Sequence, residues 1–354
     1  MRRRIRWRAF AIAGLTTTIL GALLAPPARA AADTVALPLP SYRDMQVDDS
    51  HRRVFVAGGD EILAVDDGGR ILRTITGQVG VSGLTLSADG SRLYAGLRGA
   101  GAISVIDTKK LREVARYPTG ALCPGDVVLA VGKLWFSAAC TDNTSSGSMA
   151  ALDLATGEVV TYATFLPAVW GVPLLAVSVR EGWPTTLVLA ARDLSGSQLR
   201  TYDITFGAPD PMCWNPGGCQ APLSGIVQDI AVTRDGANLV VASGAQYHSV
   251  IPVIGLVTVD TYPTGPSPTA VAVGEGDLLA LGSEGPAGSE PDVFGYAWGA
   301  ESPLWTVDFG LRPTAYNDVA SRGLAWTAGN NRLYAVVTDR DGSLPVLHIL
   351  VPPA

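Results

Sequence analysis

The stretch Leu86–Gly120, LSADGSRLYAGLRGAGAISVIDTKKLREVARYPTG, alternates short apolar segments with turns. Asp89-Gly90 is a dipeptide of the kind that supplies the positive φ values a tight hairpin needs. After a second strand that ends in Leu93-Tyr94-Ala95-Gly96, further strands are expected at Ala102–Ile106 and near Val114–Tyr117. Four antiparallel strands in about 40 residues correspond to one blade of a β-propeller.

The same order of strands and turns recurs along the rest of the chain. An aromatic or aliphatic residue marks the second strand of each unit, and successive markers are 39 to 55 residues apart because loop insertions lengthen some units. The sequence therefore predicts an all-β, seven-bladed propeller of four-stranded antiparallel blades. The markers are Phe55, Tyr94, Trp135, Val188, Val240, Leu279 and Tyr334.

The repeats predict one propeller domain over residues 31–354. The last blade supplies only three strands of its own, and the N-terminal segment Thr34–Leu39, TVALPL, is expected to be its fourth strand, which would close the ring and leave few unpaired edges. The blades are expected at approximately 41–80, 81–120, 121–168, 169–225, 226–265, 266–312 and 313–354.

Residues 1–30 have the features of a signal peptide. The basic segment MRRRIRWR is followed by the apolar run AFAIAGLTTTILGALLA, and the segment ends in Ala28-Arg29-Ala30, a small-x-small cleavage signal. Export across a bacterial-type membrane and a secreted, extracellular mature protein are the expectation. No later segment has the 18 or so apolar residues that a membrane span requires.

Composition excludes one class of partner and predicts disulfides. The net charge is −6 and no basic run follows the expected signal peptide, which argues against a nucleic-acid-binding surface. Four cysteines in an exported protein predict two disulfides. Cys123 and Cys140 fall on the same face of one blade, which leaves Cys213 to pair with Cys219 in the segment CWNPGGC.

Two alternative roles for the cysteines are disfavoured. A CxxC redox centre has two intervening residues, whereas five separate Cys213 from Cys219. A zinc site needs four cysteine or histidine ligands with matching spacing, and the three histidines, His51, His248 and His348, fall in different blades.

The repeat resembles that of the YVTN-type, surface-layer-like β-propeller family, which runs roughly P-x-x-IAVSPDG-x-x-LYVAN, then VSVIDT-x-T-G and a closing VG. The segments LSADGSRLYAG, ISVIDT and YPTG within Leu84–Gly120 match it best, and Asp153–Val160, DLATGEVV, repeats its third turn. The chain also looks like secreted actinobacterial propellers. The resemblance implies a seven-bladed fold but no single activity, because the family includes binding, scaffold and enzymatic members.

We label the strands of each blade A to D from the channel outwards. The A–B and C–D turns share one face, which we call the short-turn face, and the B–C and D–A loops share the other, the loop face. Four long insertions are all assigned to B–C or D–A loops, which predicts that the loop face binds a ligand. They are Cys140–Ser148, Phe206–Gly225, Gly244–Ser249 and Ser283–Asp292.

Four aromatic residues fall in or beside these loops and favour recognition of an extracellular protein or polysaccharide, since exposed Trp and Tyr are frequent in interfaces. The alternative is that each packs beneath a loop. The residues are Trp170, Trp214, Tyr247 and Tyr316. Trp214 lies within CWNPGGC, which we interpret as a rigid loop on the loop face.

Three aspartates, Asp44, Asp126 and Asp229, precede strand A in the first, third and fifth blades, at the mouth of the channel. Carboxylates that converge there could bind Ca²⁺, and no other cofactor is expected. Two alternatives stay open. The aspartates could accept hydrogen bonds from turn N–H groups, or they could pair with Arg43 and Arg322, which flank the same opening and are candidate ligand-binding residues.

The predicted function is non-catalytic binding or scaffolding by a monomer. The alternative is a secreted lactonase or other hydrolase that acts at the channel mouth. No catalytic residue is assigned, because the sequence has neither a G-x-S-x-G elbow nor a phosphate-cradling glycine loop.

Overall fold

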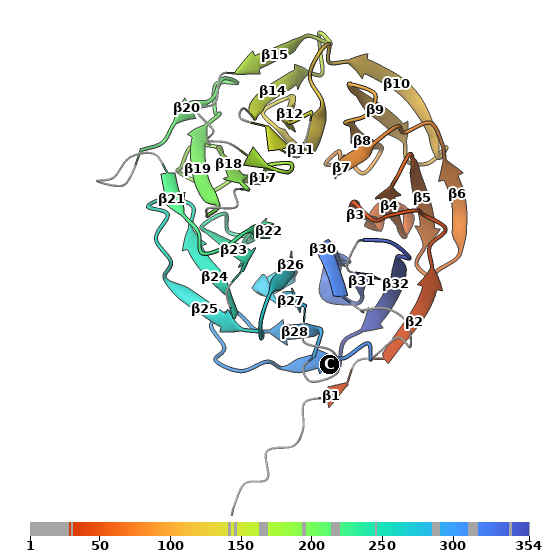
Figure 1. Ribbon diagram of the computed structural model, residues 1–354, viewed down its shortest axis with the longest axis vertical. Helices are drawn as coiled ribbons and strands as arrows, with labels where there is room; N and C mark the ends of the chain where they lie inside the picture. The colour runs from red at the N-terminus through yellow and green to blue at the C-terminus, as the bar shows by residue number, and fades with distance from the viewer. Residues whose placement is uncertain are drawn as a thin grey trace, which may run out of the picture.

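The computed structural model describes residues 28–29, 31–140, 143–144, 147–162, 169–192, 196–213, 220–244, 246–284, 291–310, 318–339 and 342–353. Seven antiparallel sheets stand around a central channel as the blades of a ring (Figure 1). Within the described part of the chain, the helical elements are three short 3-10 turns, η1 (Asp49–His51), η2 (Glu275–Asp277) and η3 (Ala328–Asn330). The predicted seven-bladed, all-β fold is confirmed.

The strands of the seven blades follow in chain order, from the channel outwards. Blade 1 has β3 (Asp44–Asp48), β4 (Arg53–Gly58), β5 (Glu61–Asp66) and β6 (Ile71–Ile75); blade 2 has β7 (Val81–Leu86), β8 (Arg92–Leu97), β9 (Ala102–Asp107) and β10 (Arg112–Pro118); blade 3 has β11 (Pro124–Ala130), β12 (Lys133–Ala138), β14 (Ser148–Asp153) and β15 (Val159–Tyr162). Blade 4 has β17 (Leu174–Ser178), β18 (Thr186–Ala191), β19 (Gln198–Asp203) and an outer strand in two pieces, β20 (Asp210–Pro211) and β21 (Gln220–Pro222). Blade 5 has β22 (Val227–Val232), β23 (Asn238–Ser243), β24 (Tyr247–Pro252) and β25 (Asp260–Pro263); blade 6 has β26 (Pro268–Val273), β27 (Leu279–Ser283), β28 (Val293–Tyr296) and β29 (Trp305–Val307).

Blade 7 combines the two ends of the chain. Its strands β30 (Asp318–Trp326), β31 (Leu333–Thr338) and β32 (Val346–Val351) are joined by β2 (Ala31–Ala36), which pairs antiparallel with β32 from Ala31↔Val351 to Ala36↔Val346. The expected closing strand therefore exists, although it begins three residues earlier than Thr34 and ends at Ala36. A two-residue strand, β1 (Ala28–Arg29), lies within the expected signal peptide and pairs parallel with β29.

The hydrophobic core is divided among the blade interfaces. The described residues form seven clusters of buried apolar side chains, and each cluster joins residues of two neighbouring blades. Strand B supplies the most buried members, such as Phe55 and Trp135, which are fully inaccessible to solvent. Burial of a side chain such as Phe55 contributes about 2 to 3 kcal/mol. Face-to-face packing of consecutive blades thus holds the ring together.

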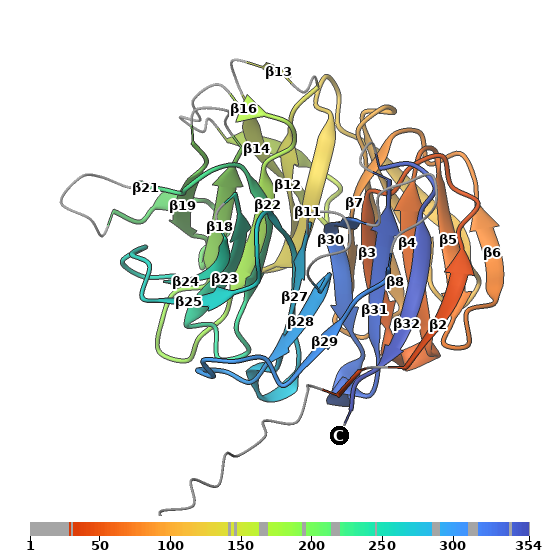
Figure 2. The ribbon, with the colours of Figure 1, turned by 60° about the horizontal axis from the view of Figure 1, so that its bottom comes forward.

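Blade 4 departs from the sequence-based expectation. Both pieces of its outer strand pair with β19, through Tyr202↔Pro211 and Leu199↔Ala221. The assignment of Phe206–Gly225 to a loop on the loop face is therefore wrong. Phe206 lies in the C–D turn, and the segment that contains CWNPGGC starts and ends in strand D at the perimeter of the ring (Figures 1 and 2). A solvent-facing strand of two or three residues needs no apolar alternation, and Gly and Pro are frequent in the segment Phe206–Gly225 around it, so the sequence alone predicts a loop there.

The loop face carries one additional sheet. Strands β13 (Asn143–Thr144) and β16 (Val169–Trp170) form a two-stranded ribbon that joins the B–C loop of blade 3 to the segment before blade 4. Figure 2 shows this ribbon beyond the ends of the blade strands. No helix in the described residues is long and apolar enough to cross a membrane.

Candidate functional site at the channel mouth

The three predicted channel-mouth aspartates occupy equivalent places in blades 1, 3 and 5, and all are buried. In each, Oδ1 accepts a hydrogen bond from the N–H of the following residue, at 2.8 to 2.9 Å. Each aspartate thus fixes the start of its own strand A, as one of the sequence-based alternatives proposed. The residues are Asp44, Asp126 and Asp229.

The other carboxylate oxygen reaches the next blade. Oδ2 of Asp44 accepts from the N–H of Leu84, at 2.6 Å. Asp126 accepts in the same way from Leu175, at 2.7 Å, and Asp229 from Val271, at 2.8 Å. We call these three arrangements the aspartate clamps. They join blades 1 and 2, 3 and 4, and 5 and 6.

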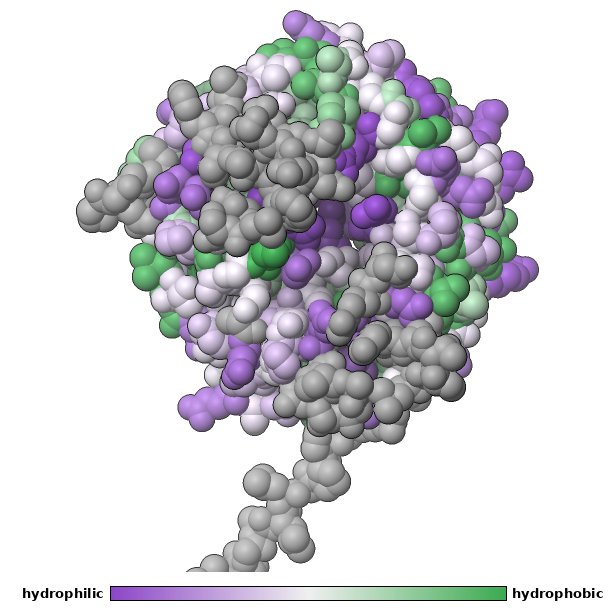
Figure 3. All heavy atoms as spheres, viewed as in Figure 1, coloured by the Kyte–Doolittle hydropathy of each residue, from purple (hydrophilic) through white to green (hydrophobic). Residues whose placement is uncertain are grey.

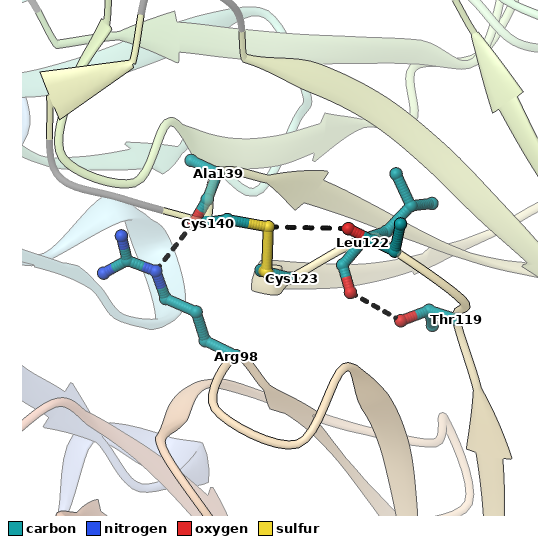
Figure 4. The surroundings of a disulfide bond; sticks show 7 residues. Arg98, Thr119, Leu122, Cys123, Ala139 and Cys140 are labelled. Atoms are coloured by element: carbon teal, nitrogen blue, oxygen red, sulfur yellow. Dashed lines mark hydrogen bonds between the residues drawn. A yellow bond between two sulfur atoms is a disulfide. The ribbon is translucent and has the colours of Figure 1, made fainter.

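Arginines join two of the interfaces that have no aspartate clamp. Arg98 directly follows strand B of blade 2, and its Nε donates to the carbonyl of Ala139 in blade 3, at 2.7 Å (Figure 4). Arg192 directly follows strand B of blade 4, and its Nε donates to the carbonyl of Val227 in blade 5, at 2.7 Å. Charged donors make stronger hydrogen bonds than neutral ones, so these contacts add to the apolar packing between blades 2 and 3 and between blades 4 and 5.

The seventh blade sends a bulge into the channel. Strand β30 has nine residues, and its pairing with β31 shifts register between Val319 and Leu324. Arg322 lies in this bulge with φ 61°, a left-handed backbone conformation that is uncommon for a side chain of this size. The hydroxyl of Tyr42 donates to the carbonyl of Arg322, at 2.7 Å, which helps to hold the bulge in place.

The bulge contacts three other blades. The guanidinium of Arg322 pairs with Asp44 Oδ2 at 3.0 Å in blade 1 and with Asp126 Oδ1 at 2.7 Å in blade 3. The hydroxyl of Ser321 donates to Gln228 Oε1 in blade 5, at 2.7 Å. The same amide oxygen accepts from Arg192, so the contacts of the seventh blade are connected to the blade 4–5 interface.

Burial and charge set the ionisation of this group. Burial raises the pKa of Asp44 and of Asp229 to about 7, although Arg322 and the backbone N–H groups favour their ionised forms. Burial lowers the pKa of Arg322, but the carboxylates of Asp126, Asp44 and Asp229 outweigh it and raise that pKa well above its usual value. Arg322 is therefore always charged, whereas two of its carboxyl neighbours change protonation near neutral pH.

A polar cavity of about 150 Å³ lies beside these side chains. Its lining includes the three aspartates, Arg322 and Gln46. Figure 3 shows hydrophilic residues gathered around the hollow at the centre of the ring. Such a cavity has room for a few water molecules or a small polar group, which could contact Arg322, whose side chain is 19 % exposed.

The residues do not fit the predicted Ca²⁺ site. All six carboxylate oxygens of the three aspartates already accept hydrogen bonds or ion pairs, and Arg322 lies between Asp44 and Asp126. In the described ranges, no group of three His, Cys, Asp or Glu side chains is arranged to hold a metal ion. The structure instead has the predicted ion pair for Arg322. Arg43 is exposed, and its backbone N–H donates to the carbonyl of Ala57.

The predicted disulfide between Cys123 and Cys140 is confirmed. It joins the segment before strand A of blade 3 to the segment after strand B, with the two Cα atoms 4.9 Å apart (Figure 4). The hydrogen bond of Arg98 to Ala139 lies next to it. The predicted pairing of Cys213 with Cys219 lies outside the described residues, since Cys219 is not among them.

The predicted aromatic residues are not gathered into one described site. Tyr247 opens β24 and is 37 % exposed. The backbone of Trp170 lies in the loop-face ribbon, paired with Asn143. Trp214 and Tyr316 lie outside the described residues.

Sequence reasoning missed Arg98, Arg192, Ser321 and Gln228. A signal for the two arginines was available, because each directly follows strand B in an even-numbered blade. The bulge that places Ser321 and Arg322 in the channel has no comparable signal in the repeat.

Comparison with known proteins supports the fold and no finer assignment. No protein-family model matches the chain, and no curated protein does. Among solved structures, the one titled Crystal structure of RRP9 WD40 repeats aligns with a TM-score of 0.66 at 15 % identity, over 93 % of this chain and 99 % of that one. Kuenenia stuttgartiensis Hydrazine Synthase aligns with a TM-score of 0.63 at 14 % identity, over 85 % of this chain and 93 % of that one. The chain is thus similar in fold to WD40-repeat propellers.

Proposed function

We propose that this protein is a secreted, monomeric binding or scaffold propeller that recognises an extracellular protein or polysaccharide through its loop face. The observation that carries this proposal is that the channel-mouth carboxylates serve as structural hydrogen-bond acceptors within and between blades. One oxygen of each aspartate accepts from its own strand and the other accepts from the next blade, so the aspartates stabilise a rigid ring. A rigid ring that carries variable loops is suited to recognition.

The described part of the loop face supports this assignment. The ribbon of β13 and β16 stabilises the two segments that it joins, and Trp170 belongs to it. Tyr247 is a partly exposed aromatic residue on the same face, in blade 5. Tyr and Trp bury a large area at low entropic cost when they bind a partner, and they stack well on sugar rings.

The test is retention of the protein on cell-envelope polysaccharide and on envelope protein, immobilised separately. The Trp170→Ala and Tyr247→Ala variants should each lower retention at least about tenfold, as for a residue that contributes 1.4 kcal/mol or more. Trp298→Ala is the matched control, because Trp298 is 39 % exposed in a C–D turn on the opposite face. Equal retention of all four proteins would contradict the proposal.

We further infer that the chain is an exported, divergent YVTN-type propeller of actinobacterial type. The support is the sequence of residues 1–30 and the repeat at Leu84–Gly120. Cleavage after Ala30 would remove β1 but keep β2, and with it the fourth strand of blade 7. Mass spectrometry of the protein from the culture medium should give an N-terminus at Ala31. A protein that stays in the cytoplasm and still carries residues 1–30 would contradict this inference.

One observation favours a second candidate, a hydrolase that acts on small lactones. Asp44 and Asp229 line a polar cavity and have pKa values of about 7, which suits a general acid or base. Assays with a panel of lactones test this. Turnover that falls at least a hundredfold in the Asp229→Asn variant would support the hydrolase over the binding proposal.

A further inference from the structure

Among the described residues of blades 3 and 4, the most exposed apolar side chains lie on the short-turn face, opposite the loop face. Val131 lies in the A–B turn of blade 3, Val179 and Trp183 in the A–B turn of blade 4, and Phe206 in the C–D turn of blade 4. They are 39 %, 68 %, 44 % and 95 % exposed. We call these four residues the turn patch. Apolar side chains that cluster on a surface mark interaction sites more often than single ones do.

Hydrogen bonds between the turns that carry the patch fix the positions of these turns relative to one another. The ammonium of Lys133, next to the blade 3 turn, donates to the carbonyl of Gly207, next to Phe206, at 2.7 Å. The N–H of Thr185 donates to the hydroxyl of Thr205 at 3.0 Å, which joins the two turns of blade 4. Because these turns are ordered before any partner arrives, binding there has a low ordering cost.

Val131 has a strained backbone conformation that gives no evident benefit to the stability of the fold. The two central residues of its hairpin turn, Val131 and Gly132, have φ values of 46° and 73°. Turns of this kind favour Asn-Gly, and a β-branched residue with positive φ is strained. An exposed valine there is disfavoured both by its backbone and by its contact with water. Strain of this kind is often retained where the side chain serves binding.

The high exposure of Phe206 also indicates that the turn patch serves binding. A tight turn, closed by the N–H of Gly207 donating to the carbonyl of Ile204 at 2.8 Å, presents its ring to solvent. A side chain that is 95 % exposed gains almost nothing from the packing of the blade. Its contribution to stability is therefore negligible, which leaves contact with a partner as a reason for an aromatic residue here.

The charges around the patch indicate the chemistry of the partner. On the short-turn face of blades 3 to 6, the exposed acidic residues outnumber the exposed basic ones, which are Arg234 and Arg180, whose guanidinium lies over the ring of Trp183. On the same face of blades 1, 2 and 7, by contrast, Asp66, Asp67 and Asp107 are paired with arginines. The exposed acidic residues in or beside the turns of blades 3 and 4, which carry the patch, are Glu158, Glu181 and Asp210, and those of blades 5 and 6 are Asp235, Asp260, Glu275 and Glu301.

We propose that the turn patch is a docking surface for a protein that presents basic side chains around apolar sockets for Phe206 and Trp183. Complementary charge steers such a partner towards the acidic surroundings, and the apolar side chains supply most of the affinity. A second copy docked through the same patch would bring like charges together, and an anionic membrane would be repelled in the same way. This site is separate from the loop face, so the protein would hold two partners on opposite faces.

The test is selection of random peptides on the immobilised protein. Peptides that combine Lys or Arg with Trp, Phe or Leu should be enriched, and they should bind the Phe206→Ser variant at least tenfold more weakly. Val131→Asn should also weaken binding while leaving the melting temperature equal or higher, because Asn-Gly suits the turn. Val114→Ser is the matched control, since Val114 is 44 % exposed on the outer strand of blade 2, and it should bind normally.

Several results would overturn the proposal. Enriched peptides that are acidic would contradict the charge argument, and equal binding to wild type and Phe206→Ser would contradict the location. Light scattering that shows a dimer lost in Phe206→Ser would assign the patch to a second copy. Co-sedimentation of wild type, but not Phe206→Ser, with phosphatidylglycerol vesicles would assign it to a membrane. Tyr247→Ala, on the loop face, should leave the selected peptides bound, which separates this site from the proposed loop-face site.

Discussion

Blades 1 to 6 and blade 7 are held in the ring by different means. The first six form three pairs, and in each pair an aspartate at the start of one blade accepts a backbone N–H from the next. Blade 7 has no partner for a fourth clamp. It is tied in by the N-terminal strand β2 at its outer edge and by the bulge with Arg322 at its inner edge.

Because each aspartate clamp joins two blades, a ring of seven leaves one blade without a clamp, and blade 7 is that blade. Three buried clamps place three carboxylates around one channel, where their charges repel each other. Arg322, from the unpaired blade, lies against two of them and supplies the opposite charge. The seventh blade therefore stabilises the three clamps as well as closing the ring. Variants at the outer edge of blade 7, at its inner edge and at the clamps test this relationship.

Deletion of residues 31–39 should have the largest effect. It removes β2 from the edge of β32 and removes Leu37 and Leu39, which are buried in the cluster between blades 7 and 1. Loss of two buried leucines costs about 2 to 5 kcal/mol each, which approaches the whole stability of many domains. We expect insoluble protein or an early, broad melting transition by calorimetry. A transition within about 2 °C of the wild-type value would show that blade 7 is closed by its inner contacts alone.

The Arg322→Met variant should lose about 3 to 5 kcal/mol of unfolding free energy, as is usual when one partner of a buried ion pair is removed. Methionine keeps most of the volume but leaves the carboxylates of Asp44 and Asp126 without their cation. Urea denaturation at pH 8, above the pKa of about 7 that Asp44 has in the wild-type protein, measures the loss. Arg43→Met is the control, since Arg43 is exposed at the same opening, and should change stability by less than about 0.5 kcal/mol.

The aspartate clamps should differ in strength according to their contact with blade 7. Asp126→Asn loses the ion pair with Arg322 and should cost about 3 kcal/mol. Asp229 accepts the same two backbone hydrogen bonds but makes no ion pair within the described residues, so Asp229→Asn should cost only about 1 kcal/mol. Denaturant titrations of the two variants at pH 5, below the pKa of Asp229 in the folded protein, provide the comparison. A cost for Asp229→Asn as large as that for Asp126→Asn would show that the clamps are independent of the seventh blade.

The smallest effect is a change in the pH dependence of stability. Burial raises the pKa of Asp229 from its ordinary value of 3.8 to about 7 in the folded protein. Between pH 3.8 and about pH 7, the folded state therefore binds more protons than the unfolded state. Its contribution to stability is complete below pH 3.8 and is lost as the pH rises through about 7. Asp229→Asn should remove about 1 kcal/mol per pH unit of this downward slope between about pH 5 and 7.

Thermal melts of wild type and Asp229→Asn at constant ionic strength measure that slope. The comparison is needed because other groups contribute. Burial raises the pKa of Asp292 to about 7, which adds to the fall, and burial lowers the pKa of His248 to about 3, which destabilises the folded state as the pH drops below 6.5. Both groups are present in both proteins. Parallel profiles would show that Asp229 is ionised throughout this range.

The repeat made most of the fold predictable. Turn dipeptides and second-strand markers placed all seven blades, and the three aspartates were identified at equivalent positions because each precedes strand A. The outer strand of blade 4 was missed, since two exposed pieces, β20 and β21, are too short to show a period. Phe206 was consequently placed on the wrong face.

The contacts inside the channel were only partly predictable. Pairing of Arg322 with the aspartates was one of the open alternatives, because Arg322 lies near the start of the last strand A. The bulge in β30 places Arg322 against the aspartates, and this local change of register cannot be recognised in the repeat sequence. The cross-channel bond from Ser321 to Gln228 joins residues 93 positions apart, and a pattern within single blades says nothing about such a pair.

The most direct test of the link between the seventh blade and the clamps is a double-mutant cycle on Arg322 and Asp126. The unfolding free energies of wild type, Arg322→Met, Asp126→Asn and the double variant are measured by urea denaturation at pH 8. We predict a coupling energy of about 2 kcal/mol or more, with the double variant less destabilised than the sum of the single ones. Additive effects, within about 0.5 kcal/mol, would contradict the account, because blade 7 and the clamps would then be independent.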